Sequence, residues 1–219
     1  MLLIDTVLWD LDGTLLNTLE DLTAAVNYTM DYFGLPTRTL AQVRRYVGSG
    51  TRVLFERAFA ENETHPTVDA AMEIYLPYYD ANCNNRTRPY DGVPEMLDKL
   101  AAAGVKMAIV TNKPDSAAKI LAQRYFGGLP AMGDLPGQPK KPDPALCLRA
   151  MEELGSLPER TVYVGDSEVD VATARNAGLP CKTVTWGFRD HDELVEAGAT
   201  DLFDHAGALC AHLLELVKK

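Results

Sequence analysis

Two acidic residues separated by a single residue, Asp10 and Asp12, follow a short apolar run and precede Gly13-Thr14. Paired carboxylates can take different roles in a reaction, because one can attack a substrate while the other transfers protons. A bare pair of this kind is more often a solvated turn. A phosphate ester is the substrate that best suits this density of acid, provided that a divalent cation neutralises the carboxylates and the phosphoryl oxygens together.

Polar residues also follow two other apolar runs. Thr111 and Asn112 follow the run at 105–110, and Asp166 follows the run at 161–165. In open parallel sheets, ligands bind at the carboxyl ends of the strands, so we expect these residues to meet Asp10 at one crevice. The hydroxyl and amide of Thr111 and Asn112 are groups that can hold a phosphoryl oxygen.

The same crevice is expected to hold a metal ion. Asp10, Asp12 and Asp166 offer the oxygen ligands that Mg²⁺ prefers. Asp170 follows Asp166 by four residues, on the same face of a starting helical turn. A second interpretation of Asp170 is stabilisation of the helix dipole. Lys141 would supply a positive charge to the site.

Strands and helices alternate from residue 90 onward, which predicts an α/β fold with a parallel, doubly wound sheet covered on both faces. Residues 17–88 instead show helical spacing throughout, which is typical of a small helical bundle. We therefore predict a Rossmann-like core of residues 1–16 and 89–219 with a helical insertion at 17–88. The expected strands are 6–10, 105–111, 161–165 and 182–185, and the expected helices are 19–33, 39–47, 53–59, 72–79, 94–103, 116–126, 143–151 and 170–176.

Two segments of the chain have weaker patterns. Pro77 should kink or end the helix at 72–79, because proline cannot complete the helical hydrogen bonds. Residues 127–138 are rich in turn formers, and residues 133–138 within them show no clear strand.

Composition narrows the class of partner. The 219 residues include 21 basic and 31 acidic side chains, and a net charge of −10 disfavours nucleic acid or an anionic membrane. Apolar runs fall far short of the ~20 residues that a bilayer span needs, and the opening residues lack the basic start of a signal peptide. Four scattered cysteines form no C-x-x-C pair, which indicates reduced thiols. We expect a cytoplasmic protein, monomeric or homodimeric.

Four motifs occur in the same order as in the haloacid dehalogenase-like hydrolase superfamily, and together they span nearly the whole chain. They are Asp10-x-Asp12-Gly13-Thr14, Val110-Thr111-Asn112, Lys141-Pro142-Asp143-Pro144 and Gly165-Asp166-Ser167-x-x-Asp170. Within the superfamily the chain most resembles the phosphoglycolate phosphatases. The stretches that carry this likeness are Val47-Gly48-Ser49-Gly50, Tyr90-Asp91-Gly92-Val93-Pro94, Thr111-Asn112-Lys113-Pro114 and Val184-Thr185-Trp186-Gly187-Phe188-Arg189.

The resemblance implies a role for each acid of the crevice. Asp10 would be the nucleophile that forms an aspartyl-phosphate, which divides a difficult hydrolysis into two steps. Asp12 would protonate the leaving oxygen and then activate water. Magnesium would sit on Asp10, on the carbonyl oxygen of Asp12 and on Asp166. Asp170 would act through a water molecule or as a support.

The resemblance also implies how the phosphoryl group is held. Thr111, Asn112 and Lys141 would bind it, and Lys141 would restrain Asp10 as well. Lys140 is an alternative to Lys141, because the chain before the third motif is short and its alignment is the least secure.

In relatives, the helical insertion is a mobile cap that closes over the site and selects the substrate. Gly48, Ser49 and Gly50 would approach the ligand, or would form a plain turn between helices. Arg52 would pair with a substrate carboxylate, or would be an ordinary exposed helical arginine. Relatives usually have an acidic residue and a serine where this chain has Asn17-Thr18, a difference that bears on how the cap hinge is held.

We therefore expect a magnesium-dependent phosphatase of small phosphorylated metabolites, with 2-phosphoglycolate as the first candidate substrate. Nucleotide or pyrophosphate hydrolysis and sugar-phosphate mutase chemistry are alternatives on the same scaffold, although no acid and base pair for a mutase is apparent in the cap. A third alternative is a silent module that only binds a phosphorylated ligand. Such a module would be expected to lack Asp10 or Asp12, and both are present.

Overall fold

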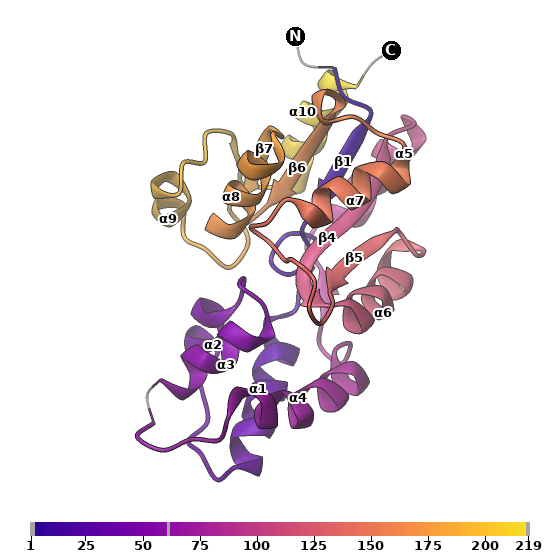
Figure 1. Ribbon diagram of the computed structural model, residues 1–219. Helices are drawn as coiled ribbons and strands as arrows, with labels where there is room; N and C mark the ends of the chain where they lie inside the picture. Colours follow the sequence, from indigo (N-terminus) through magenta and orange to yellow (C-terminus); the bar gives the residue numbers. More distant parts are fainter. Residues whose placement is uncertain (1–2, 61, 218–219) are drawn as a thin grey trace.

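The main sheet has six parallel strands in the order β5-β4-β1-β6-β7-β8 (Figure 1). The computed structural model describes residues 3–60 and 62–217, so the ends of the predicted core, 1–2 and 218–219, lie outside the described residues. The strands are β1 Thr6–Trp9, β4 Lys106–Pro114, β5 Ala131–Asp134, β6 Thr161–Gly165, β7 Cys181–Val184 and β8 Leu202–Phe203.

Helices cover both faces of this sheet, because successive side chains of a buried strand point to opposite sides. Leu8 packs in one apolar cluster with residues of α7 and α8, whereas Val7 and Trp9 pack in another with residues of α5, α6 and α10. The predicted doubly wound parallel sheet is confirmed. The helices of the core are α5 Val93–Ala102, α6 Asp115–Phe126, α7 Ala145–Leu154, α8 Glu168–Ala177, α9 His191–Glu196 and α10 Ala206–Leu216, with a short 3₁₀ helix at Pro158–Arg160.

Strand register determines which polar residues meet. Trp9 of β1 lies opposite Ile109 of β4 on one side and Val164 of β6 on the other. β1 ends at Trp9 and β6 one residue beyond Val164, whereas β4 runs on past Ile109 to Pro114 and carries Thr111 within it. Asp10 follows Trp9 directly, so it lies at the same edge of the sheet as Thr111 and Asp166.

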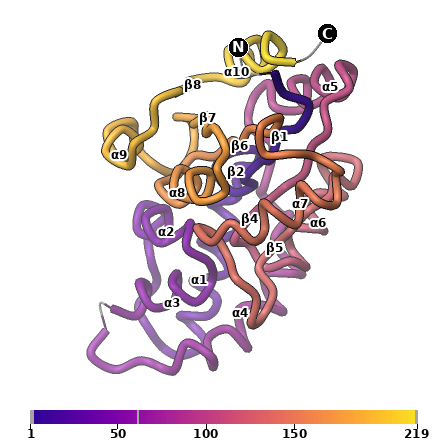
Figure 2. The backbone as a smooth tube through the Cα atoms, turned by 45° about the horizontal axis from the view of Figure 1, so that its top comes forward, coloured from indigo at the N-terminus to yellow at the C-terminus, as the bar shows by residue number. Residues whose placement is uncertain are grey.

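Residues between β1 and β4 leave the sheet through a narrow connection. Strands β2 Leu16–Asn17 and β3 Arg88–Pro89 pair antiparallel and carry the chain into and out of a helical bundle (Figure 1). The predicted domain boundaries fall in this pair of strands. The bundle contains α1 Leu19–Tyr32, α2 Leu40–Tyr46, α3 Thr51–Phe59 and α4 Val68–Asn82, and its tube lies below the sheet in the turned view of Figure 2.

Two expectations about secondary structure need correction. Helix α4 continues through Pro77 to Asn82, so the proline does not end it. The turn-rich segment 127–138 contains β5 Ala131–Asp134 at the edge of the sheet, and the last two residues of this strand fall in the stretch 133–138 expected to lack a clear strand. Gly133 accounts for the weak signal, because a Cβ there would lie 2.4 Å from Cα of Asp115. Close backbone packing at this position excludes the side chain that would mark a strand.

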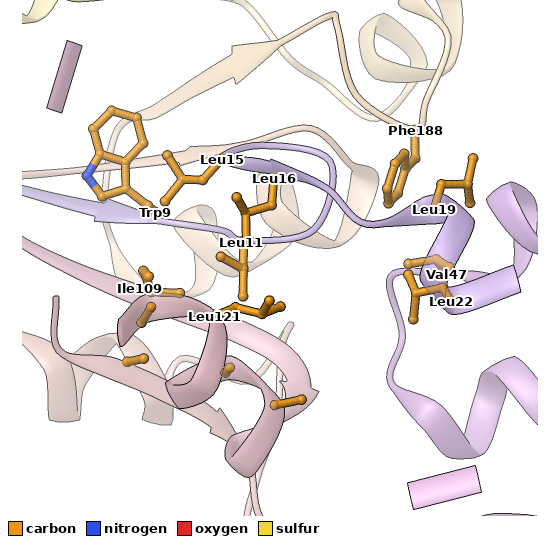
Figure 3. Packing of buried hydrophobic residues seen from close by; sticks show 14 of the residues in the cluster. Trp9, Leu11, Leu15, Leu16, Leu19, Leu22, Val47, Ile109, Leu121 and Phe188 are labelled. Atoms are coloured by element: carbon orange, nitrogen blue, oxygen red, sulfur yellow. The ribbon is translucent and has the colours of Figure 1, made fainter. Parts of the chain in front are cut away.

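Cap and core share an apolar contact beside the sheet edge. Phe188 of the core lies beside Leu19 and Leu22 of α1 and near Val47 of the cap, and all four belong to one buried cluster (Figure 3). The bundle therefore packs directly on the core in this structure. Within the described residues, no helix combines the length and apolar character that crossing a bilayer requires.

Candidate active site

The predicted crevice lies between the carboxyl edge of the sheet and the connection from α2 to α3. It is a cavity of about 40 Å³, which has room for only a few water molecules. The cavity is lined by six of the predicted core residues and two of the predicted cap residues. These are Asp10, Asp12, Thr111, Asn112, Lys141 and Asp166 from the core, and Gly48 and Gly50 from the cap.

A buried ammonium group ties two of the acids together. Nζ of Lys141 lies 2.8 Å from Oδ1 of Asp10 and 2.8 Å from Oδ1 of Asp170, and it donates to the hydroxyl of Tyr163 at 3.0 Å. The neighbouring Lys140 instead lies 3.6 Å from Asp134. Of the two lysines considered from the sequence, Lys141 is thus the one whose ammonium reaches Asp10.

Asp170 is fully occupied by protein contacts. Its Oδ1 accepts from Lys141 and Tyr163, and its Oδ2 accepts from the main-chain N–H of Asp166 at 3.2 Å and from the hydroxyl of Ser167 at 2.5 Å. Asp170 and Ser167 also form a capping box at the start of α8. These contacts favour a supporting role for Asp170 over one as a direct ligand.

Two loops close tightly around Asp166. Its Oδ1 accepts from the Thr14 hydroxyl at 3.0 Å, and its Oδ2 accepts from the Phe188 N–H at 2.7 Å. A Cβ at Gly13 or at Gly187 would lie 2.3 Å from Oδ2 of Asp166. Gly13 also adopts a φ of 87°, which favours glycine. The sequence Asp12-Gly13-Thr14 therefore needs its glycine in order to bring the first acidic loop against Asp166.

The charges of this cluster are unbalanced. Ligand oxygens of Asp10, Asp166 and Asp170 lie within 4.8 Å of one another. Burial raises the pKa of the Asp10 carboxyl to about 7, and Asp170 adds to the rise while Lys141 opposes it. Burial also raises the pKa of Asp166, to which Asp170 and Asp10 contribute. A set of crowded, buried oxygen donors with excess negative charge fits a hard divalent cation such as Mg²⁺.

The Asp12 carboxylate lies outside this three-acid group. Its Oδ1 accepts from the Thr18 hydroxyl at 2.6 Å and from Nζ of Lys113 at 2.8 Å, and its Oδ2 lies 3.1 Å from the same Nζ. The carboxylate is thus held by Thr18 and Lys113. The Thr18 contact joins the start of the cap to Asp12.

Sequence reasoning assigned no role to two basic residues of the cavity. Lys113 contacts Asp12, and Arg189 donates to the carbonyl oxygens of Val47 at 2.7 Å and Arg44 at 3.2 Å at the end of α2. Both residues occur in stretches that resemble phosphoglycolate phosphatases. Nothing in the local pattern indicates that either side chain is buried.

The cap residues named from the sequence divide into two groups. The carbonyl oxygen of Gly48 accepts from Nδ2 of Asn112 at 3.0 Å, which joins the cap loop to the core, and Gly50 also lines the cavity. Ser49 is not among the lining residues; its hydroxyl faces Arg57 at 3.5 Å. Arg52 is 47% exposed and pairs with Asp69. The structure therefore does not bring Arg52 to the cavity, because its helix turns the side chain toward α4.

Comparison with known proteins places this geometry in a family. The model of the haloacid dehalogenase-like hydrolases matches residues 7–184, a range that includes Asp10, Asp12, Thr111, Lys141, Asp166 and Asp170. The chain belongs to the haloacid dehalogenase-like hydrolase family.

Relatives of known name resemble the chain over most of its length. Phosphoglycolate phosphatase 1 of Pseudomonas aeruginosa is 37% identical over 91% of this chain and 76% of its own. Phosphoglycolate phosphatase of Agrobacterium fabrum is 37% identical over 97% of this chain and 94% of its own. A crystal structure titled a predicted phosphoglycolate phosphatase, from Haemophilus somnus, is 27% identical with a TM-score of 0.87, over 95% of this chain and 97% of its own.

Proposed function

We propose that this chain is a Mg²⁺-dependent phosphatase that hydrolyses a small phosphomonoester, 2-phosphoglycolate in the first place, through an aspartyl-phosphate on Asp10. The likeness to phosphoglycolate phosphatases over most of the chain makes it a phosphoric monoester hydrolase. The observation that carries the finer proposal is the meeting of Asp10, Thr111, Lys141 and Asp166 around one cavity.

The proposed reaction has two steps on the chain's own residues. A carboxylate oxygen of Asp10 attacks phosphorus, the bond from phosphorus to the ester oxygen breaks, and Asp12, which enters this step protonated, gives that oxygen its proton. The Asp12 carboxylate then accepts a proton from water as the water oxygen attacks phosphorus and the bond from phosphorus to the Asp10 oxygen breaks, so that Asp12 is protonated again. Hydrolysis releases phosphate and restores Asp10.

A cation and a hydroxyl at the sheet edge are placed to bind the oxygens of the phosphoryl group. Lys141 and Thr111 would bind its oxygens, and Lys141 keeps Asp10 oriented through their 2.8 Å contact. A magnesium ion held by Asp10, Asp166 and the carbonyl oxygen of Asp12 would neutralise charge shared by the carboxylates and the phosphoryl group. Asp170 would position Lys141 through its own ion pair with the ammonium.

The cap side chains favour a small substrate. Those around the cavity include the apolar Leu22, Leu54 and Tyr75, which offer few polar groups to a sugar or a nucleoside. The cavity of about 40 Å³ must widen for any phosphomonoester, 2-phosphoglycolate included, and it must widen least for the smallest. Among the described residues that line the cavity, none from the cap is acidic, so the acid and base pair that mutase chemistry needs has no support there.

The substrate class can be tested with a panel. We expect kcat/KM for 2-phosphoglycolate to exceed the values for 5′-AMP, glucose 6-phosphate and pyrophosphate by at least about tenfold. The nucleoside and the sugar are larger and more polar than the apolar cap side chains suit, and pyrophosphate would place additional negative charge against them. Phosphate release should be measured for each substrate at the same Mg²⁺ concentration. Equal values across the panel would rule out the small-substrate proposal, and a preference for a nucleotide would favour the first alternative.

Magnesium binding can be tested without turnover. Calorimetric titration is expected to show one Mg²⁺ site per chain, and Asp166→Asn should weaken it by at least about tenfold, since a buried ligand charge is lost. The matched control is Asp98→Asn, the same change on the exposed face of α5. Unchanged affinity in Asp166→Asn, or an equal loss in Asp98→Asn, would contradict the proposed site.

A further inference from the structure

Lys113 is a buried lysine of the cavity to which the proposed reaction assigns no role. It follows Asn112 near the end of β4, and its side chain is 1% exposed. Its Nζ lies 2.8 Å from Oδ1 and 3.1 Å from Oδ2 of Asp12. An ammonium so fully removed from water needs partners, and the Asp12 carboxylate supplies both charge and hydrogen-bond acceptors.

A cap residue fixes the other side of this ammonium. Nζ of Lys113 donates to the hydroxyl of Tyr79 on α4 and lies 4.6 Å from the centre of its ring. Tyr79 is itself held by stacking on Tyr75, with ring centres 5.2 Å apart, and both rings are buried. Lys113 is therefore confined between the cap and Asp12.

Each of the two acids in the first motif thus has its own lysine. Lys141 contacts Asp10 at 2.8 Å, and Lys113 contacts Asp12 at 2.8 Å. A side chain that exchanges a proton with a leaving oxygen must be held at the correct distance and angle, since a displacement of about 1 Å can cost 10²-fold in rate. Thr18 provides the one further contact that the structure gives this carboxylate.

We propose that Lys113 is a positioning residue that orients the Asp12 carboxylate for proton transfer, and that Tyr79 of the cap sets the place of its ammonium. This inference rests on the proposed function, in which Asp12 protonates the leaving oxygen. In this proposal Lys113 acts through Asp12, to which its ammonium is hydrogen-bonded. A cap residue thereby takes part in proton transfer at the core.

The test uses leaving groups that differ in their need for a proton. Acetyl phosphate releases acetate, a stable anion that leaves without protonation. Ethyl phosphate would release an alkoxide, which needs a proton from the acid in order to leave. The two are similar in size and neither carries a carboxylate, so they differ mainly in the demand on the acid. 2-Phosphoglycolate has a similarly poor leaving group together with a carboxylate. The quantity to compare is kcat/KM, which reports only the steps up to departure of the leaving group.

We expect Lys113→Met to lower kcat/KM by about 10- to 100-fold for ethyl phosphate and 2-phosphoglycolate, and by no more than about threefold for acetyl phosphate. Tyr79→Phe should give the same pattern with a smaller loss. The double variant should be no worse than Lys113→Met alone, because both changes act on one contact chain. Lys113→Arg, which keeps a cation beside Asp12, should recover part of the loss.

Activity toward acetyl phosphate also serves as the folding control for each variant. The matched control is Lys119→Met, which removes an exposed lysine of α6 that pairs with Asp115, and it should leave all three substrates unchanged. Asp12→Asn should show the same selective loss as Lys113→Met, and a larger one.

Three results would overturn the inference. An equal loss on all three substrates in Lys113→Met would make Lys113 a phosphoryl-binding or structural residue. A loss of kcat/KM for 2-phosphoglycolate alone would indicate that Lys113 binds the substrate carboxylate. No loss on any substrate would leave it without a role. If Asp12→Asn lowers kcat/KM equally for all three substrates, Asp12 is not the acid, and both the proposed role of Asp12 and the inference about Lys113 are wrong. If Asp12→Asn shows the selective loss and Lys113→Met does not, only the inference about Lys113 is wrong.

Discussion

Replacing Asp10 with asparagine is expected to lower kcat/KM for 2-phosphoglycolate by at least about 10⁴-fold, because an amide has no anionic oxygen with which to attack phosphorus. The change keeps the size and planarity of the side chain. It should therefore remove the nucleophile while Thr111, Lys141 and Asp166 remain around the cavity.

Stability should change little in the same variant. Burial raises the pKa of the Asp10 carboxyl to about 7, so holding this group charged is unfavourable in the metal-free protein. Asparagine removes that charge, and Lys141 keeps Asp170 as a partner at 2.8 Å. We expect the free energy of unfolding in urea to change by no more than about 1–2 kcal/mol.

Steady-state kinetics and covalent trapping would measure the effect together. Acid quenching of the wild-type protein during turnover should yield a phosphorylated Asp10 peptide by mass spectrometry, and Asp10→Asn should yield none. The matched control, Asp98→Asn, makes the same chemical change on an exposed helix. Turnover by Asp10→Asn within about tenfold of the wild type would refute a covalent role for Asp10.

The central sheet and the meeting of the acids could be predicted from sequence because both depend on local pattern. The runs that became β1, β4 and β6 are apolar and short, and each ends at a polar residue. Parallel strands place their carboxyl ends together, so Asp10, Thr111 and Asp166 had to meet once the strands were neighbours. The register of Trp9 with Ile109 and Val164 places Asp10, Thr111 and Asp166 within one or two residues of the same level, although β4 itself continues to Pro114.

Other features depend on contacts between distant segments, which local pattern does not encode. Lys113 became a buried ion-pair partner through Asp12, 101 residues away in the sequence, and through Tyr79 of the cap. Arg52 has the same local character as many exposed helical arginines, and only the packing of α3 on α4 shows that it pairs with Asp69. The edge strand β5 is short and contains Gly133, so its identity rests on pairing with β4.

Lys141→Met is expected to cause the second largest loss of activity after Asp10→Asn. Comparison with Lys140→Met distinguishes the roles of the two adjacent lysines. The ammonium of Lys141 contacts Asp10 and Asp170, both buried, and it is the predicted holder of the phosphoryl group. Its loss should lower kcat/KM by about 10³-fold, in line with removal of a charged group that stabilises the transition state. Lys140→Met should stay within about threefold, because Lys140 faces Asp134 across 3.6 Å at a partly exposed site.

The same pair of variants should differ in stability at neutral pH. Burial by itself lowers the pKa of Lys141, but Asp10 and Asp170 outweigh it and hold that pKa above its ordinary value. The stabilisation is therefore fully present below the ordinary lysine pKa and is lost only as the pH rises through the higher folded value. At pH 7, Lys141→Met leaves two buried acids without their cation and should reduce the free energy of unfolding by about 3 kcal/mol.

Urea denaturation of both lysine variants, with and without Mg²⁺, would decide the matter. We expect Lys141→Met to unfold at lower urea and Lys140→Met to match the wild type. Added Mg²⁺ should restore part of the stability of Lys141→Met, because the ion offsets the negative charge that the buried carboxylates are left with, yet it should not restore turnover. A larger catalytic loss in Lys140→Met than in Lys141→Met would reverse the assignment of the phosphoryl-binding lysine.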